Sequence, residues 1–321
     1  MSRESHVSAI MPVFNGEVFL GEAIESVLAQ SHGNVELVVV NDGSTDGSAG
    51  ILAGYGSRIR VFHEENLGPA VARNRAIAAA QGEWIAFLDQ DDVWERNRLE
   101  RQLAALRPGD DGVHSECRII DAAGRTIRAR FSHGENEEYT TLARTITLNP
   151  IYVPTVLVRR RAVLEVNGLD PANRFGTDDY QLSLRLLATG HRYHYLPDVL
   201  ASYRVHGRNR SANHTSMMRG DIYAIGQTYA EYPQGFRRAD LTAFHAKMHE
   251  LYFTLGWHYQ DNGEPAEARR CFRQAAAHRP TCWRTLLCAA AASWPGGGAL
   301  AAARRLAGPK PTAAQQSGWY G

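Results

Sequence analysis

The sequence predicts an α/β fold, a mostly parallel sheet flanked by helices, followed by an all-helical C-terminal extension. Hydrophobic runs with the character of strands alternate with helix-period segments over the first hundred residues. Beyond about residue 215 the strand signals stop and helical periodicity continues alone. A chain of 321 residues that is 44% hydrophobic is long enough for one large α/β domain and such an extension.

The first half of the predicted sheet follows from short hydrophobic runs. The expected strands cover residues 7–14, 35–40, 59–62 and 84–88. A helix is expected after Asn15 and Gly16, because Leu20, Ile24 and Val27 fall on one helical face, and an Ala-rich helix is expected over residues 70–80. The run over residues 35–40 is almost continuously apolar, which is typical of a strand buried on both faces of a parallel sheet.

Charge and composition exclude several classes of protein. The 35 Lys and Arg residues balance 34 Asp and Glu residues, so we expect no nucleic acid partner. The apolar runs are far shorter than the ~20 residues of a spanning helix, and residues 1–6 do not resemble a signal peptide, which predicts a cytoplasmic protein. Arg residues between positions 204 and 238 leave a peripheral association with an anionic inner membrane open, although a solvated surface is the favoured explanation.

An acidic cluster follows the last strand of this first half. Asp89, Asp91 and Asp92 come where the apolar run ends, and open α/β sheets bind ligands at that carboxyl edge. Oxygen ligands at such an edge suit Mg²⁺ or Mn²⁺ carrying a diphosphate. The chain has neither a Gly-x-Gly-x-x-Gly motif after the first strand nor a Gly-x-x-x-x-Gly-Lys motif, so carboxylates, a metal and an Arg are expected to hold the nucleotide.

Polar turns end the other strands as well. Residues 12–15, 41–44, 66–69 and 89–91 all fall at the same predicted edge of the sheet. Asn, Asp and Gly are ordinary turn residues, so any one of these segments could be only a turn. Four of them at one edge indicate a ligand site.

Five segments together resemble family 2 glycosyltransferases, which have the GT-A fold. They occur in the family's order at residues 8–15, 26–31, 39–46, 66–74 and 87–94. The resemblance covers about residues 6–210 and implies transfer of a sugar from a nucleotide-diphosphate donor, with a UDP-sugar favoured, and with inversion at the anomeric carbon. A glycan, a glycolipid or another hydroxyl compound would be the acceptor, typically in surface polysaccharide biosynthesis.

The resemblance also implies site residues. Pro12, Phe14 and Glu17 would line the base and ribose, and Asp42 would accept a hydrogen bond from a ring N–H of the base. Phe14 stands where the family often has Tyr, so stacking remains but a phenol contact is absent. The implied nucleotide-binding set is Pro12, Phe14, Glu17, Asp42, Asn66, Arg73, Asp89 and Gln90, with Asp91 and His206 as ligands of Mn²⁺ or Mg²⁺.

An acidic pair begins a helix in the second half of the domain. Residues 174–185 resemble the family's Glu-Asp motif, with Asp178 in the Glu position and Asp179 as the expected general base. N-terminal capping is the alternative, since Thr and Asp both stabilise the start of a helix. Both roles can hold for neighbouring residues. The shorter side chain of Asp178 reaches a different point from that of a Glu.

Segments farther along the domain extend the resemblance. Residues 154–160 are similar to the strand that lines the acceptor pocket, and a strand is expected over residues 199–203. After it, Arg204 or Arg208 could neutralise the leaving group. The Gln-x-x-Arg-Trp motif and membrane helices of processive synthases are missing, so addition of a single sugar is expected.

The C-terminal part resembles one tetratricopeptide repeat from about residue 251 to Pro280. One repeat cannot build a solenoid, so a helical hairpin packed on the catalytic domain or on a second subunit is favoured over a peptide-binding groove. The predicted organisation is a GT-A domain over residues 1–214, divided into a nucleotide-sugar half (6–105) and an acceptor half (106–214). A helical domain (215–308) and a flexible tail (309–321) follow. Two other functions stay open, a nucleotidyltransferase and an inactive GT-A domain that serves as a scaffold.

Overall fold

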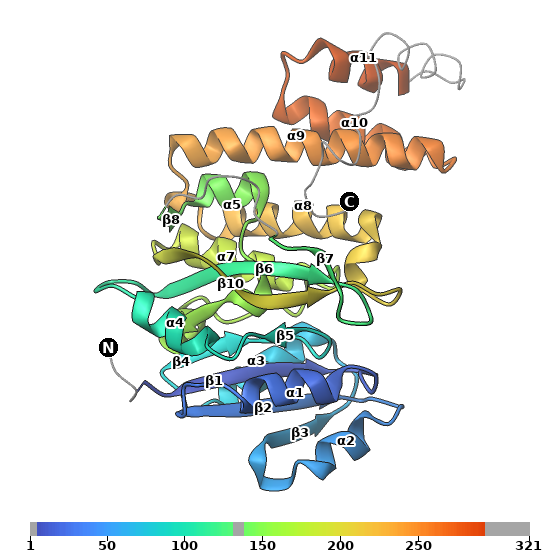
Figure 1. The fold of residues 1–321 in the computed structure, drawn as a ribbon. Coiled ribbons are helices and arrows are strands. Elements are labelled where there is room, and N and C mark those ends of the chain that lie inside the picture. The colour runs from blue at the N-terminus through green and yellow to red at the C-terminus, as the bar shows by residue number, and fades with distance from the viewer. Residues whose placement is uncertain (1–4, 131–137, 293–321) are drawn as a thin grey trace.

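The computed structural model describes residues 5–130 and 138–292, so the predicted tail at residues 309–321 lies outside the described part. A twisted sheet with helices on both faces forms one end of the molecule, and a stack of helices covers the other end (Figure 1). The α/β fold class with a C-terminal helical extension is confirmed.

The first half is a parallel βαβ array. Its elements are β1 (Val7–Val13), α1 (Leu20–Leu28), β2 (Val35–Asp42), α2 (Ser48–Gly54), β3 (Arg60–Glu64), α3 (Pro69–Ala79) and β4 (Trp84–Phe87). β1 pairs in parallel with β2 and with β4, and β2 pairs in parallel with β3. The four strands predicted for this region are therefore confirmed, and their ends shift by one or two residues.

The second half makes the sheet mixed. Its strands are β5 (Val93–Trp94), β6 (Gly112–Ile120), β7 (Thr126–Arg128), β8 (Tyr139–Thr140), β9 (Leu157–Arg159) and β10 (Tyr193–Arg204), and its helices are α4 (Arg98–Ala105), α5 (Leu142–Leu148), α6 (Arg160–Glu165) and α7 (Asp178–Ala188). β9 lies antiparallel between β4 and β6, while β6 and β10 form a long parallel pair. The sheet order is β3-β2-β1-β4-β9-β6-β10-β5.

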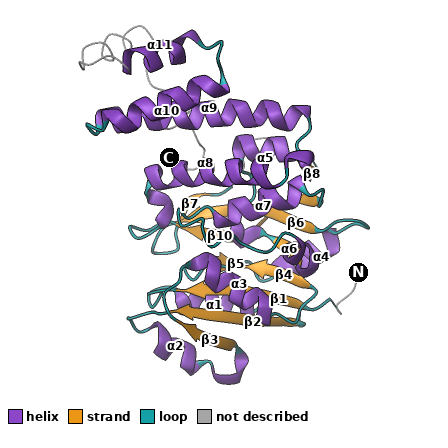
Figure 2. Ribbon diagram, turned by 180° about the vertical axis from the view of Figure 1, so that it is seen from behind, coloured by secondary structure: helices purple, strands orange, loops and turns teal. Residues whose placement is uncertain are grey.

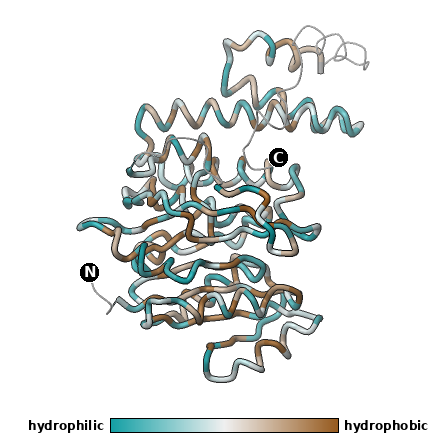
Figure 3. Tube along the Cα trace, viewed as in Figure 1, coloured by the Kyte–Doolittle hydropathy of each residue, from teal (hydrophilic) through white to brown (hydrophobic). Residues whose placement is uncertain are grey.

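Two apolar layers hold the helices to the sheet. Met11 and Val39 face α1 in one layer, and Ile10 and Val40 face α3 in the other. Successive residues of a strand point to opposite faces, so an uninterrupted hydrophobic run fills both layers. Hydrophobic stretches run along the strands in Figure 3, and side chains such as Ile10 and Met11 are fully buried.

Four helices follow the sheet. They are α8 (His214–Glu231), α9 (Arg238–Asp261), α10 (Pro265–His278) and α11 (Trp283–Ala292). A third apolar cluster joins α5 and α7 to α8 and α9, and it includes Tyr180, Leu184 and Phe244. α10 and α11 pack farther out, around Trp257 and Phe272 (Figure 2). The first two helices of the extension, α8 and α9, therefore pack directly on α5 and α7.

Within residues 5–130 and 138–292, no helix combines the length and the apolar character needed to cross a membrane. All four cysteines are free thiols, and Cys117, Cys271 and Cys288 are buried. Cys282 is only partly buried.

Candidate functional site

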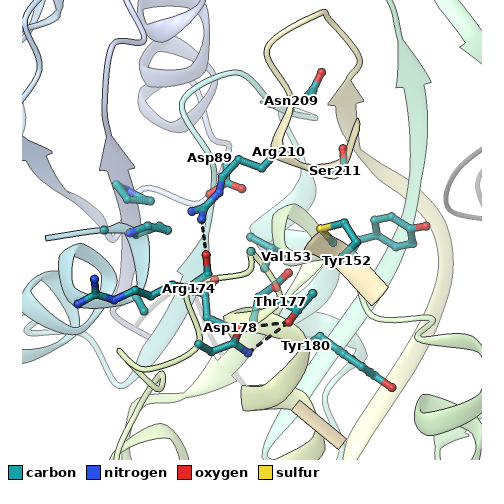
Figure 4. A pocket seen from close by; sticks show the side chains of 18 of the residues that line it. Asp89, Tyr152, Val153, Arg174, Thr177, Asp178, Tyr180, Asn209, Arg210 and Ser211 are labelled. Atoms are coloured by element: carbon teal, nitrogen blue, oxygen red, sulfur yellow. Dashed lines mark hydrogen bonds between the residues drawn. The ribbon is translucent and has the colours of Figure 1, made fainter. Parts of the chain in front are cut away.

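A single large cavity gathers the polar ends of the strands. It encloses about 1600 Å³, and its walls include the turns at residues 12–16, 66–70 and 89–91 together with Asp42. The segment after β10, the start of α7 and one face each of α8 and α9 close the other sides. In Figure 4, Asp178 and Thr177 lie below the loop that carries Asn209, Arg210 and Ser211. The predicted convergence of the turns on one edge is present.

Gln90 fixes the acidic turn to the end of β1. Its side-chain oxygen accepts a hydrogen bond from the Phe14 N–H at 2.8 Å, and its amide nitrogen donates to the Phe14 carbonyl at 3.0 Å. A Cβ on Gly16 would lie only 2.4 Å from that Gln90 oxygen, so glycine makes room for this clasp. Phe14 itself is 43% exposed and lines the cavity beside Pro12, which leaves its ring free to stack on a planar ligand.

Asp42 connects the second turn to the third. Its buried carboxylate accepts hydrogen bonds from the backbone N–H groups of Leu67 and Gly68 at 2.8 and 2.9 Å. The neighbouring Asn66 is exposed in the cavity wall. Gly43 has a φ of +74°, and a Cβ there would lie 2.9 Å from the Asn66 backbone nitrogen. Both features hold the two turns close together.

Glu17 lies outside the cavity wall. Its carboxylate accepts a hydrogen bond from the Gly47 N–H at 2.8 Å, and its own N–H donates to Asp46 at 3.0 Å. The structure therefore places Glu17 behind the turn that follows β2, where it shapes the loop next to Asp42.

Arg73 joins the two halves of the site. One of its guanidinium nitrogens donates to Asp89 at 2.5 Å and another donates to Asp178 at 2.8 Å. Burial alone would lower the pKa of Arg73, but the carboxylates of Asp89, Asp178 and Asp179 raise it above its ordinary value. The arginine is therefore a permanent cation under the acidic turn.

Asp91 and His206 form a second pair in the cavity. The His206 Nε2 lies 2.9 Å from the Asp91 carboxylate, and the His206 ring stacks on Phe19 at 5.1 Å. Burial and the nearby Asp89 raise the pKa of Asp91, although His206 opposes the shift. Arg204 donates to the Asp91 carbonyl at 2.8 Å and lies over the same Phe19 ring. These contacts fix both the acidic turn and the imidazole.

This pair offers two side chains of the kinds that ligate metals, and not a complete metal site. In the described parts of the chain, no group of three or more His, Cys, Asp and Glu side chains is arranged to hold a metal ion. Two ligands placed side by side at ~2.1 Å from one octahedral ion are about 3.0 Å apart, and the Asp91 and His206 atoms are 2.9 Å apart. The two side chains therefore fit neighbouring positions around a divalent ion that takes its other ligands from outside the described residues.

Asp178 and Asp179 differ in their surroundings. Asp178 is buried against Arg73, whereas Asp179 is partly exposed and lines the cavity. Burial in the cavity wall and the Asp178 carboxylate raise the pKa of Asp179 to about 7, against the opposing effect of Arg73. The N-cap Thr177 makes no side-chain capping bond, because its hydroxyl bonds with Asn173. Capping by Thr177 is therefore absent, although an acid in the first turn still suits the helix dipole.

Sequence reasoning missed one wall of the cavity. His214, Met217, Met218 and Asp221 of α8 line it, as do Lys247, Glu250, Leu251 and Thr254 of α9. Each set has the i, i+3, i+4, i+7 spacing of a single helical face. That spacing is present in the sequence, but only the packing of α8 and α9 on α5 and α7 shows that the faces are turned toward the site.

An acidic turn, an Asp–His pair and the adjacent carboxylates of Asp178 and Asp179 lie around one cavity at the edge of this sheet, an arrangement that suits a glycosyltransferase. The family model described as "Glycosyl transferase family 2" matches residues 8–167, and a tetratricopeptide repeat model matches residues 249–282. The chain belongs to glycosyltransferase family 2, since it is 32% identical over 212 residues to the putative teichuronic acid biosynthesis glycosyltransferase TuaG of Bacillus subtilis, covering 82% of that protein and 64% of this chain.

Other relatives agree with this family. An uncharacterized glycosyltransferase of Nostoc is 34% identical and matches over 65% of this chain and 67% of its own length. One of Rickettsia felis is 30% identical over 65% of this chain, but the match spans only 36% of that longer protein.

Two solved structures share the fold. Staphylococcus aureus TarS residues 1–349 in complex with UDP has a TM-score of 0.54 at 19% identity, with 87% of this chain and 93% of that one covered. The mannosyltransferase PcManGT from Pyrobaculum calidifontis, in complex with GDP-Man and Mn²⁺, has a TM-score of 0.61 at 20% identity and covers 98% of this chain and 84% of that one. The predicted GT-A fold and the glycosyltransferase class are thus confirmed.

Proposed function

We propose that this glycosyltransferase is an inverting, metal-dependent enzyme that moves one sugar from a nucleotide-diphosphate donor, with UDP favoured, to an acceptor hydroxyl. The observation that carries the proposal is the link through Arg73, which holds the acidic turn at Asp89 and the first turn of α7 in one cavity. A donor bound at the turn would then present its anomeric carbon near Asp179.

The donor nucleotide would lie along the turns of the first half. Phe14 stacks on the base beside Pro12, and Asp42 accepts a hydrogen bond from a ring N–H. Each Asp42 oxygen already accepts one backbone bond, and a carboxylate oxygen has a second lone pair for the base. Glu17 supports this subsite through Gly47.

The sugar diphosphate would continue from the ribose toward the acidic turn. Asn66, Asp89 and Gln90 line that path, and Arg73 holds Asp89 in place from below. Arg208 also lines the cavity, and it would neutralise the leaving group.

Asp91 and His206 would hold Mn²⁺ or Mg²⁺, which when bound neutralises charge on the departing diphosphate. The fold neighbour PcManGT is in complex with GDP-Man and Mn²⁺, which supports a divalent ion in this enzyme as well. Arg204 and Phe19 would keep the two ligands in place.

Asp179 would act as the general base. It takes the proton of the acceptor hydroxyl while that oxygen forms a bond to the anomeric carbon and the bond from that carbon to the diphosphate oxygen breaks. Attack opposite the leaving group inverts the centre, and nucleoside diphosphate departs. A base with a pKa of about 7 is well matched to proton transfer at neutral pH. Asp178, paired with Arg73, positions the first turn of α7.

The wider role is also a proposal. TuaG is named for teichuronic acid biosynthesis, which supports a function in surface polysaccharide assembly at the cytoplasmic face of the membrane.

The domain organisation and the associations of the chain are proposals as well. The catalytic domain would span residues 1–214 and the helical domain residues 215–308. Peripheral binding through Arg residues 204–238 predicts salt-sensitive binding to anionic liposomes. Self-association through the C-terminal helices predicts a dimer mass in light scattering.

The first experiment is a thermal-shift screen of UDP, GDP, dTDP and CMP, each with and without Mn²⁺. A ligand that binds only the native state raises the melting temperature by mass action. We expect one diphosphate to give a metal-dependent shift, and its sugar derivative to release free nucleoside diphosphate on turnover. No shift with any of the four would contradict the proposed donor site.

A further inference from the structure

The cavity is larger than a donor site requires. Pockets for one small ligand enclose roughly 300–1000 Å³, whereas this one encloses about 1600 Å³. The turns that would hold the nucleotide account for one side of it, and α8 and α9 account for the opposite side. The space next to α8 and α9 is therefore available to the second substrate.

Gly220 brings α8 directly against the start of α7. A Cβ at this position would lie 2.5 Å from the Thr177 hydroxyl and 2.8 Å from Phe175, so only glycine allows this approach. Asp221 is the next residue, and it lines the cavity beside the first turn of α7. Burial raises the pKa of Asp221, Lys247 opposes the rise, and the Asp179 carboxylate adds to it. Through Gly220, Asp221 thus lies next to the segment that begins α7 and carries the proposed base.

Lys247 and Glu250 complete the polar part of this wall from α9. The Lys247 Nζ lies 3.3 Å from the Glu250 carboxylate, and the Lys247 side chain is only 13% exposed. The Lys247 ammonium also opposes the rise in the pKa of Asp221. The three side chains thus offer two carboxylate acceptors and one ammonium donor over a short distance, beside the apolar Met217 and Leu251.

The wall made by α8 and α9 and the opposite side of the cavity carry side chains of different charge. Arg174, Arg208 and Arg210 line the loops near the acidic turn, and Arg210 donates to the Arg174 carbonyl at 3.0 Å (Figure 4). Phosphate oxygens suit those arginines. Asp221 and Glu250 would repel an anion, because Lys247 is already paired with Glu250. The same side chains match sugar hydroxyls, which both donate and accept hydrogen bonds.

We propose that Asp221, Lys247 and Glu250 form an acceptor subsite that binds the hydroxyl groups of an uncharged sugar and holds one of them at Asp179. This proposal rests on the glycosyltransferase function proposed above. The helical extension is then part of the active site and determines acceptor specificity, in addition to packing on the catalytic domain.

The test uses the full chain, the donor identified by the thermal-shift screen, and p-nitrophenyl glycosides as acceptor probes. The panel holds neutral hexosides, including the glucoside, and N-acetylhexosaminides. p-Nitrophenyl glucuronide is added because it differs from the glucoside by a carboxylate in place of the hydroxymethyl group. We expect transfer to at least one neutral glycoside and a higher KM for the glucuronide than for the glucoside. Asp221→Asn and Lys247→Met should each raise the acceptor KM about tenfold, the effect of one lost charge-assisted hydrogen bond, while nucleotide affinity measured by calorimetry stays the same.

The control is Gln227→Ala, an exposed position on α8, which should change neither quantity. Unchanged acceptor KM in both subsite variants would overturn the proposal, as would a preference for the glucuronide over the glucoside. Donor turnover without transfer to any neutral glycoside would overturn it too. Absence of nucleotide binding and of diphosphate release would instead reject the proposed function itself, so the two failures are distinguishable.

Discussion

Arg73 of α3 donates a hydrogen bond to Asp178, 105 residues later in the chain, at 2.8 Å. Both side chains are nearly inaccessible, at 7% and 3% exposure. The guanidinium also holds Asp89, so one arginine sets the distance between the acidic turn and the proposed base helix. An ion pair of this kind fixes geometry more than it adds stability, because burying both charges is costly.

Removal of this arginine should be strongly destabilising. Arg73→Met leaves Asp178 buried without its cation, and breaking a buried pair from one side lowers the free energy of unfolding by about 3 kcal/mol or more. Chemical denaturation measures the loss. The control is Arg75→Met on the same helix, whose pair with Glu64 is exposed, and a change below about 1 kcal/mol is expected there. Equal effects at both positions would contradict the structural role of Arg73.

Asp179→Asn should reduce turnover strongly without weakening donor binding. The amide keeps the shape of the side chain but cannot accept the acceptor proton, and loss of a general base typically lowers kcat by about 10²–10⁴-fold. Nucleotide affinity, measured by calorimetry with Mn²⁺, should stay within about twofold because Asp179 lies on the acceptor side. Full turnover in this variant would rule out Asp179 as the base.

The pH profile offers an independent test of the same residue. Burial and Asp178 raise the pKa of Asp179 to about 7, and only the deprotonated form can accept a proton. Activity at saturating donor should therefore fall about tenfold per pH unit below that value and level off above it. Burial also raises the pKa of Asp221 to about 7, so the two residues have to be distinguished. Activity of Asp221→Asn should still fall below pH 7, whereas the residual activity of Asp179→Asn should not. A flat profile between pH 5 and 8 would contradict the assignment.

Arg204 is expected to govern metal affinity through Asp91. It is fully buried, donates to the Asp91 carbonyl, and pairs with Glu22 at 2.6 Å. Lys cannot make these contacts together, and loss of a group that orients metal ligands usually costs 10- to 100-fold in affinity. Arg204→Lys should thus need about tenfold more Mn²⁺ to reach the same nucleotide-induced thermal shift. Glu22→Gln, which leaves the bond to Asp91 intact, should change the requirement much less.

How far the sequence predicts this molecule depends on how local each signal is. The strands of the first half are short hydrophobic runs followed by polar turns, and the structure confirms them. β6 was not predicted, because its buried His114, Ser115 and Glu116 interrupt the apolar pattern. The motif residues were recognised one by one, but the bond from Arg73 to Asp178 depends on tertiary packing. The cavity wall from α8 and α9 was missed for the same reason.

The close approach of α8 to α7 gives the last prediction. A Cβ at Gly220 would lie 2.5 Å from the Thr177 hydroxyl, whereas a Cβ at Gly50 in α2 meets nothing within 4 Å. Both glycines lie inside helices, where Ala is intrinsically better by roughly 0.5–1 kcal/mol. Gly50→Ala should therefore raise the free energy of unfolding slightly. Gly220→Ala should lower it by about 1–3 kcal/mol through overpacking, and it should raise the acceptor KM because α8 is pushed away from Asp179. If Gly220→Ala behaves like Gly50→Ala in denaturation and kinetics, the tight contact between the two helices, and with it the placement of Asp221 beside the base, is wrong.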